Sequence, residues 1–210
     1  SIKDGLYLLT AKVSSLEPDL IIIYYGSQHR HITFNDFKNI FGIRPPGLRS
    51  LKSIQIIETQ FRKWISNMLT ENKSEWTSIL SNKERLKNSE LYRLYSRFSE
   101  TTNNLGIPLV TTTFNMAVNE TSPKEVKEFY EPSFPGVDDR IKAIRINNET
   151  VRMHAKQSHN VYSLETGKNL NGSYLEYYSD LVHMNKEGKI ILAMNIFNGI
   201  KPILHKMLDH

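Results

Sequence analysis

Residues 20–25 form an uninterrupted apolar run, LIIIYY, which constrains the fold more than any other feature of the chain. Pro18 precedes the run and Gly26 ends it, so it has the length of one strand. Strands with one face exposed to solvent alternate apolar and polar residues. Strands of parallel sheets, by contrast, are covered on both faces and read as continuous apolar segments. The run therefore predicts a buried parallel strand over residues 19–25.

Helical and strand-like segments alternate along the rest of the chain. Further strands are predicted at 107–113 and 160–164. Apolar residues at helical spacing predict helices over residues 2–13, most of 51–103, 137–157 and 186–208. Such alternation indicates an α/β fold with a parallel sheet and right-handed crossovers. We expect the three strands to be neighbours in one sheet, with helices on both faces.

Two of these helices carry apolar stripes that are expected to face the sheet. In the helix at 137–157 the stripe consists of Val137, Ile141, Ile144 and Val151. In the last helix it consists of Ile190, Met194, Phe197, Ile200 and Leu204.

The length of 210 residues suits a single domain, 1–210, with a long and mostly helical insertion at 30–103. Hydrophobic residues make up 39% and charged residues 23%, a balance typical of globular proteins. The longest apolar run is too short to cross a bilayer. No signal peptide is visible. Neither observation determines a compartment.

The charge and the absence of cysteine exclude several kinds of site. The formal net charge is +5, but the basic residues are scattered and no motif accompanies them, so nucleic acid is not expected as a partner. The chain has no cysteine, which excludes disulfides, thiolate metal sites and a cysteine nucleophile. No cofactor is expected.

Polar residues follow each predicted strand, where ligands bind in parallel sheets. Gly26 and Gln28 follow the first strand, Asn115 closes the second, and Asp180 and His183 follow the third. A carboxylate that orients an imidazole is two-thirds of a hydrolytic triad, in which the histidine acts as the base. The Gly26 backbone N–H and the Gln28 amide are candidate donors to a developing oxyanion.

Other interpretations of the same residues remain open. Asp180 and His183 are also compatible with a solvated turn, in which Asp180 forms an Asx turn. They are compatible with metal ligation too, although D-x-x-H is a weak pattern and no second cluster supports it. Asn185 is expected to cap the last helix, with Glu187 in its first turn.

Three segments resemble sequence blocks of the SGNH (GDSL-type) hydrolases. LEPDLIIIYYGSQH at 16–29 resembles the family's P-D-h-h-h-h-h-G strand and the loop after it. GIPLVTTTFN at 106–115 resembles an intervening strand. The segment from Tyr177 to Phe197 is similar to the family's D-x-x-H block, which continues as H-x-N-x-x-G into the last helix. The residues that fit this block are Asp180, Val182, His183, Asn185 and Gly188.

The resemblance implies a three-layer α/β/α fold with a mainly parallel, flavodoxin-like sheet. It also implies a serine ester hydrolase, an esterase, acylesterase or related acyl transferase. His183 would be its base and Asp180 would orient that base, while Gly26 and Gln28 would form the oxyanion hole. The substrate would be a small-molecule, carbohydrate or lipid acyl ester. Aromatic residues would line the rim of the site: Phe34, Phe37, Trp64, Trp76, Phe129, Tyr130 and Phe134.

The chain departs from the family pattern at two points. Gln28 stands where the family has an asparagine. No Gly-Asp-Ser block, which carries the family's nucleophile, occurs in the chain. Ser27 follows a strand but lies in no G-x-S-x-G elbow. We therefore expect an upstream segment of the same polypeptide to supply the serine. The alternative is a catalytically inactive hydrolase-like module for binding or scaffolding.

Overall fold

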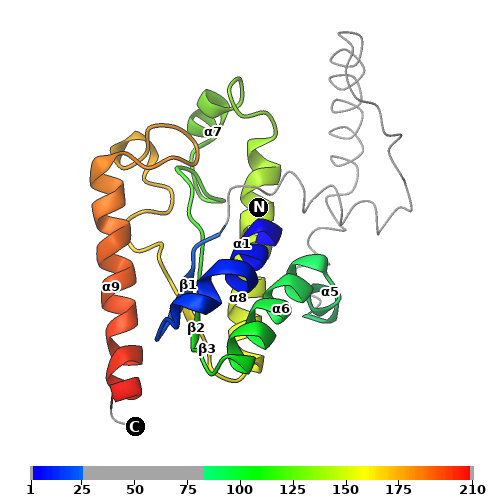
Figure 1. Ribbon diagram of the computed structural model, residues 1–210. Coiled ribbons are helices and arrows are strands. Elements are labelled where there is room, and N and C mark those ends of the chain that lie inside the picture. The colour runs from blue at the N-terminus through cyan, green and yellow to red at the C-terminus, as the bar shows by residue number, and fades with distance from the viewer. Residues whose placement is uncertain (1, 26–82, 209–210) are drawn as a thin grey trace, which may run out of the picture.

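The computed structural model describes residues 2–25 and 83–208 and contains one parallel sheet (Figure 1). Its strands are β1 (Ile21–Ile23), β2 (Leu109–Thr112) and β3 (Val161–Leu164), in the order β1-β2-β3. β1 pairs with β2 and β2 with β3, both in parallel. This confirms the predicted α/β class and the predicted neighbours.

Helices account for most of the remaining described residues (Figure 1). The chain begins with α1 (Ile2–Leu8), the π-helical turn η1 (Leu9–Val13) and the 3₁₀ turn η2 (Ser14–Leu16). Later helices are α5 (Lys83–Lys87), α6 (Glu90–Asn104), α7 (Lys124–Tyr130), α8 (Val137–Gln157), η3 (Tyr174–Glu176) and α9 (Lys186–Leu208). The bounds of α8 and α9 are those predicted.

The register of the sheet divides the core between its two faces. Ile21, Leu109 and Val161 are register partners and therefore share one face. Leu109 and Val161 pack there in a cluster with apolar residues of η1, α6 and α8. Val110 and Leu164 point to the other face and pack against Ile200 of α9. Helices therefore cover both faces of the sheet.

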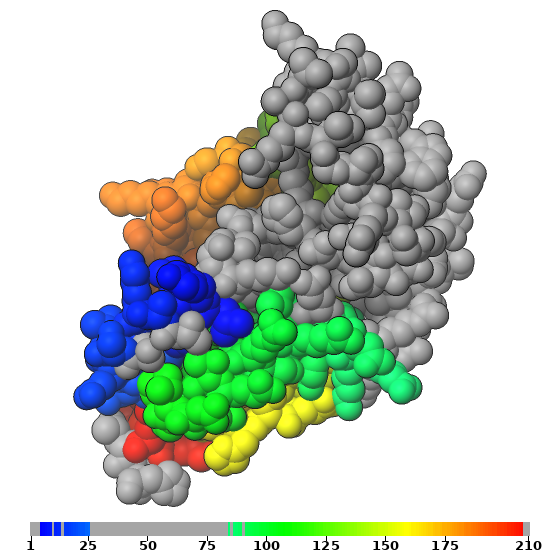
Figure 2. All heavy atoms as spheres, turned by 45° about the vertical axis from the view of Figure 1, so that its right-hand side comes forward, coloured from blue at the N-terminus to red at the C-terminus, as the bar shows by residue number. Residues whose placement is uncertain are grey.

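Helices α6 and α8 pack against the face of the sheet that carries Leu109 and Val161. Ser89 caps the start of α6: its hydroxyl accepts the backbone N–H of Tyr92 at 3.1 Å. The side of α6 that faces the core carries Leu91, Leu94, Tyr95 and Phe98, all buried. The predicted stripe of α8 is buried as well: Val137, Ile141, Ile144 and Val151. The first helix lies against α6, as Figure 2 shows on the surface.

Strand β1 is shorter than the predicted strand at 19–25. Its last carbonyl, that of Ile23, accepts the hydroxyl of Thr112 at 3.1 Å. This side-chain bond attaches the last residue of β1 to β2.

The last helix packs along a different line from the predicted stripe. Ile200 and Ile203 are buried against the sheet, and Ile196 and Met207 pack beside them. The other predicted stripe residues are exposed: Ile190, Met194, Phe197 and Leu204. The helix carries two apolar lines, and only the contacts with β2 and β3 decide which of them is buried. The predicted packing face was therefore wrong except at Ile200.

Some predictions lie outside the described residues, including most of the proposed insertion at 30–103. Its last part, 83–103, is helical as expected, in α5 and α6. The segment 116–136 contains α7. Within residues 2–25 and 83–208, no helix combines the length and the hydropathy that crossing a membrane requires.

Candidate functional site

The segment from Tyr178 to Met184 forms a tight loop just before α9. Tyr178 and Met184 form an antiparallel bridge that closes the loop. Tyr178, Leu181 and Met184 are buried and anchor it in the core. Asp180 and His183 lie between these anchors and are accessible to solvent. The buried residues therefore hold the loop in a conformation in which Asp180 and His183 both face solvent.

Backbone hydrogen bonds hold this loop in place. The Ser179 N–H donates to the His183 carbonyl at 2.8 Å, and the Asn185 N–H donates to the Tyr177 carbonyl at 3.0 Å. The Ala117 N–H donates to the Leu181 carbonyl at 3.0 Å. Because Ala117 follows β2, this last bond fixes the loop beside the carboxyl end of the sheet.

The Asp180 carboxylate contacts His183 through both of its oxygens. Oδ2 lies 2.6 Å from the imidazole Nδ1. Oδ1 accepts the backbone N–H groups of Val182 and His183, each at 2.8 Å. The bond to Val182 is the Asx turn that one interpretation of the sequence anticipated. The turn and the side-chain pair are therefore compatible, because each uses a different oxygen.

These contacts determine the charge of Asp180. Burial raises the pKa of its carboxyl, but the N–H groups of His183 and Val182 and the His183 ring lower it by more, so that the net pKa is below the usual value. Asp180 is therefore ionised at neutral pH and can only accept hydrogen bonds. The proton between Asp180 and His183 must then lie on Nδ1, which leaves Nε2 of the neutral ring as an acceptor.

The pair differs from a buried ion pair in its exposure. The His183 side chain is 76% exposed and that of Asp180 is 34% exposed. An exposed imidazole held at Nδ1 is able to take a proton from a group that approaches Nε2. The arrangement can therefore act as a general base towards a partner that lies outside the loop.

The start of α9 carries the next two residues of the block. The Asn185 side chain accepts the Gly188 N–H at 2.9 Å and donates to the Glu176 carbonyl at 2.8 Å. This confirms Asn185 as the helix cap. A Cβ at Gly188 would collide with the Tyr177 carbonyl oxygen. Gly188 is therefore required for the close packing of α9 against the loop.

Asn115 has a structural role at the carboxyl end of β2. Its amide donates to the Thr166 hydroxyl at 2.8 Å, and that hydroxyl donates to the Thr113 carbonyl at 2.5 Å. All three residues are buried. This network joins the ends of β2 and β3 and leaves Asn115 without a place in the exposed site.

The remaining candidate residues either lie outside the described residues or differ in burial from what the sequence predicted. Gly26, Ser27 and Gln28 lie outside the described residues, so the oxyanion hole stays a prediction. Among the residues that the structure describes, no group of three or more His, Asp or Glu side chains could hold a metal ion. Tyr130, proposed as a rim aromatic, is buried, whereas Phe129 beside it is exposed. No local sequence signal distinguishes these two neighbours.

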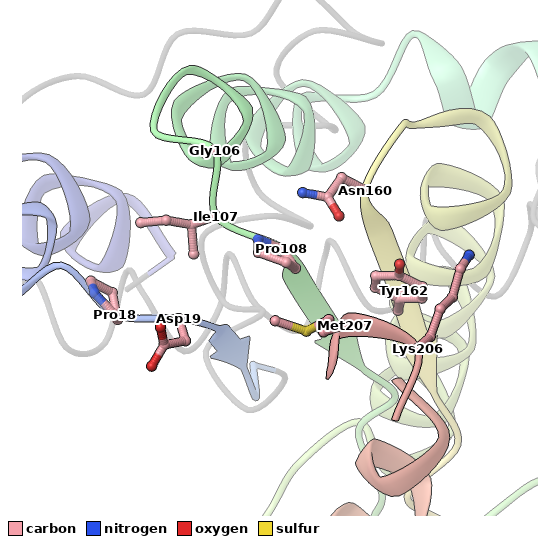
Figure 3. Close-up of a pocket in the computed structure, with 9 residues that line it drawn as sticks. All are labelled: Pro18, Asp19, Gly106, Ile107, Pro108, Asn160, Tyr162, Lys206 and Met207. Atoms are coloured by element: carbon pink, nitrogen blue, oxygen red, sulfur yellow. The ribbon is translucent and has the colours of Figure 1, made fainter. Parts of the chain in front are cut away.

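A cavity of about 470 Å³ lies at the opposite end of the sheet (Figure 3). Pro108 and Asn160 line it just before their strands begin, and Lys206 lines it from the far end of α9. His183 precedes the first residue of α9, so a helix of this length places the cavity about 30 Å away. Ligands of parallel sheets bind at the carboxyl ends of strands. The cavity therefore has no part in the site at His183.

Comparison with known proteins identified no relative of the chain. No family model, no curated protein and no solved structure matches it. The resemblance to SGNH hydrolases therefore stays a prediction, and the site is interpreted from its own geometry.

Proposed function

We propose that the protein is a serine ester hydrolase, or a related acyl transferase, in which Asp180 and His183 are the acid and the base of a triad. The contact of 2.6 Å between Asp180 Oδ2 and His183 Nδ1 is the observation that carries the proposal. Ionised Asp180 holds the ring in the tautomer that leaves Nε2 free to accept a proton. The exposure of His183 gives a serine and a substrate access to that nitrogen.

The reaction would follow the usual order of acyl transfer. Nε2 of His183 takes the proton from a serine hydroxyl while the serine oxygen attacks the ester carbonyl. The protonated ring then gives this proton to the departing alcohol, leaving an acyl-serine. Water, or an acceptor alcohol in a transferase, then attacks the acyl carbonyl as it loses a proton to His183. The ring gives this proton to the serine oxygen as the bond between serine and the acyl group breaks, which restores the free enzyme. Gly26 and Gln28 would donate hydrogen bonds to the oxyanion of each tetrahedral intermediate.

The nucleophile would come from another segment of the polypeptide, on a strand paired with β1. Strand β1 lies at one end of the described sheet, and Ile22, the middle residue of β1, is 43% exposed. Parallel sheets are normally covered on both faces, so an exposed apolar side chain on the last strand favours further chain beside β1, whose outer edge is where a further strand would pair. Such a strand would extend the sheet towards the three-layer, flavodoxin-like arrangement of the SGNH family.

A non-catalytic module for binding or scaffolding is the second candidate. One observation favours it: within residues 2–25 and 83–208, no serine hydroxyl forms a hydrogen bond with His183. A hydrolase that had lost its nucleophile would retain the same loop, because its buried anchors also stabilise the fold.

Fluorophosphonate labelling followed by mass spectrometry tests the proposed function. We expect a serine of the natural polypeptide, including any residues encoded upstream of Ser1, to be labelled. The 210-residue chain alone should be neither labelled nor active towards p-nitrophenyl acetate. His183→Ala should abolish labelling, whereas His159→Ala, at another exposed histidine, should not.

Two other outcomes would change the conclusion. Labelling of Ser27 or another serine within residues 1–210 would place the nucleophile inside the chain and contradict the split site. An absence of labelling in both forms would contradict the hydrolase and favour the non-catalytic module.

A further inference from the structure

The helices that the structure describes cover the two faces of the sheet unequally (Figure 1). Residues of α1, η1, α6 and α8 pack on the face of Leu109, and Ile23 of β1 is buried among them. On the other face, that of Val110, the described helix is α9 alone. A helix is about 10 Å across and strands lie about 4.8 Å apart, so one helix covers about two strands. One of the three strands is therefore expected to be open on this face.

Strand β1 is the strand that is open on the face of α9. Ile22 is the register partner of Val110 and therefore points to the same face. Val110 is fully buried in the cluster with α9, whereas Ile22 is 43% exposed. Side chains of parallel strands are normally covered on both faces. In the part of the chain that the structure describes, the surface above Ile22 therefore lacks the layer that α9 forms over Val110.

The exposed apolar residues of α9 lie on the side of the helix towards β1. A Cβ at Gly199 would be in contact with Leu164 of β3, and the Asn195 amide donates to the Thr166 carbonyl, just after β3. One side of α9 therefore faces β3. Each residue of a helix is rotated by about 100° from the one before it, so Phe197, two positions from both Asn195 and Gly199, points to the opposite side. Because β1 and β3 are the two ends of the described sheet, that side is the one towards β1.

Phe197 belongs to a line of exposed apolar side chains. Ile190 and Leu204 lie seven positions before and after it, which is about two helical turns, and therefore on the same side of α9. The exposed fractions are 52% for Ile190, 59% for Phe197 and 39% for Leu204. Apolar residues at this spacing form the seam along which one helix packs against another. This line and Ile22, together called the α9–β1 surface, therefore suit a helix that lies beside α9 and above β1.

The charge of the α9–β1 surface narrows the choice of the helix that covers it. Lys201 lies between Phe197 and Leu204, with its ammonium group 5.1 Å from the centroid of the Phe197 ring. A helix packed on the line would remove this cation from water, which is costly unless an acidic side chain pairs with it. In a second copy, α9 has one acidic residue, Glu187. An antiparallel pair that joins Glu187 to Lys201 would leave Leu204 beyond the start of the other helix, and a parallel pair would bring the two lysines together. A helix of different sequence is therefore favoured.

We propose that the α9–β1 surface binds an amphipathic helix of the same polypeptide, encoded upstream of Ser1, with an acidic residue opposite Lys201. The choice of this segment rests on the proposed function, which adds an upstream strand at the outer edge of β1. That strand would widen the open face of the sheet, and parallel strands are covered on both faces. The upstream segment therefore has to supply a helix as well as a strand. Packed at about 8–10 Å from α9, such a helix lies above β1 and covers Ile22.

Cysteine accessibility tests the proposed contact, because the chain has no cysteine of its own. The probes are Phe197→Cys and Leu204→Cys. The matched controls are Asn198→Cys and His205→Cys, at the next positions, which are exposed and turned by about 100° around the helix. In the natural polypeptide, with the residues encoded upstream of Ser1, we expect maleimide to modify positions 197 and 204 at least about tenfold more slowly than in the 210-residue chain. Positions 198 and 205 should react at the same rate in both forms, which mass spectrometry of the peptides measures.

Rates at positions 197 and 204 that are equal in both forms would overturn the proposal, as would a natural polypeptide that begins at Ser1. Rates at these positions that fall as the concentration of the 210-residue chain rises would assign the surface to a second copy and overturn it too. Fluorophosphonate labelling decides the hydrolase separately. A labelled serine without protection at these positions would retain the hydrolase and reject the helix, and protection without labelling would do the reverse.

Discussion

Asp180 accepts hydrogen bonds from two different parts of His183, the backbone N–H at 2.8 Å and the imidazole Nδ1 at 2.6 Å. One carboxylate thus fixes both the position of the residue and the orientation of its ring. The two residues lie in a single tight loop, so their geometry does not depend on the rest of the site.

Replacement of Asp180 by asparagine should separate these two effects. Asp180→Asn retains an acceptor for the backbone N–H groups but removes the charge, so the ring loses its preference for the tautomer with Nδ1 protonated. In the form of the protein that hydrolyses esters, we expect kcat to fall by about 10²–10⁴-fold. Steady-state hydrolysis of p-nitrophenyl acetate measures this effect. An unchanged kcat would exclude Asp180 from the triad.

Gly188→Ala should disrupt the loop through packing alone. The added Cβ would meet the Tyr177 carbonyl oxygen, which the backbone holds in place. We expect the free energy of unfolding to fall by about 1–3 kcal/mol, the usual cost of overpacking. Gly199→Ala in the same helix is the control, because its Cβ would meet only the Leu164 side chain. Chemical denaturation should show the larger loss for Gly188→Ala, and equal losses would contradict this account of Gly188.

His154 should make the stability depend on pH. This residue of α8 is buried against α6. Its Nε2 lies 3.2 Å from the Ser99 hydroxyl and 3.1 Å from the Ser158 hydroxyl. Burial lowers its pKa from 6.5 to about 4. The unfolded chain therefore binds more protons between these two pH values, and the free energy of unfolding falls as the pH decreases through this window.

The expected loss is of the order of 3 kcal/mol between pH 6.5 and pH 4, and it should be absent above pH 7. Urea denaturation at a series of pH values measures it. His154→Gln should flatten this dependence, whereas His159→Gln, at an exposed position, should retain it. A wild-type protein whose stability is constant over this window would contradict the burial of neutral His154.

Two substitutions on α9 test which of its apolar lines is buried. Ile200 is 8% exposed and Phe197 is 59% exposed. Ile200→Ala should lower the free energy of unfolding by about 2–4 kcal/mol, because it leaves a cavity against Val110 and Leu164. Phe197→Ala should cost less than about 1 kcal/mol in the 210-residue chain. Thermal denaturation compares the two variants, and a larger effect at Phe197 would restore the stripe that the sequence predicted.

The part of the candidate site that could be predicted consists of contacts between residues close together in the sequence. Asp180 and His183 are three positions apart, and Asn185 caps the helix that begins at the next residue. Contacts over such short separations follow from residue types and spacing, so they could be expected from the sequence. The packing of Tyr130 in the same apolar cluster as Leu181 could not, because it depends on how α7 packs against a segment about fifty residues later in the chain.

The same distinction holds for the fold. The apolar run before Gly26 and the alternation of helices and strands determined the α/β class and the parallel pairing, because continuous apolar runs are typical of strands in parallel sheets. Only the tertiary structure decided which side of α9 is buried, since two apolar lines on one helix are equivalent until a sheet selects between them. It also decided that Asn115 joins two strands through Thr166 rather than serving the site. Periodicity records which residues can be buried, whereas the partner that buries them comes from distant parts of the chain.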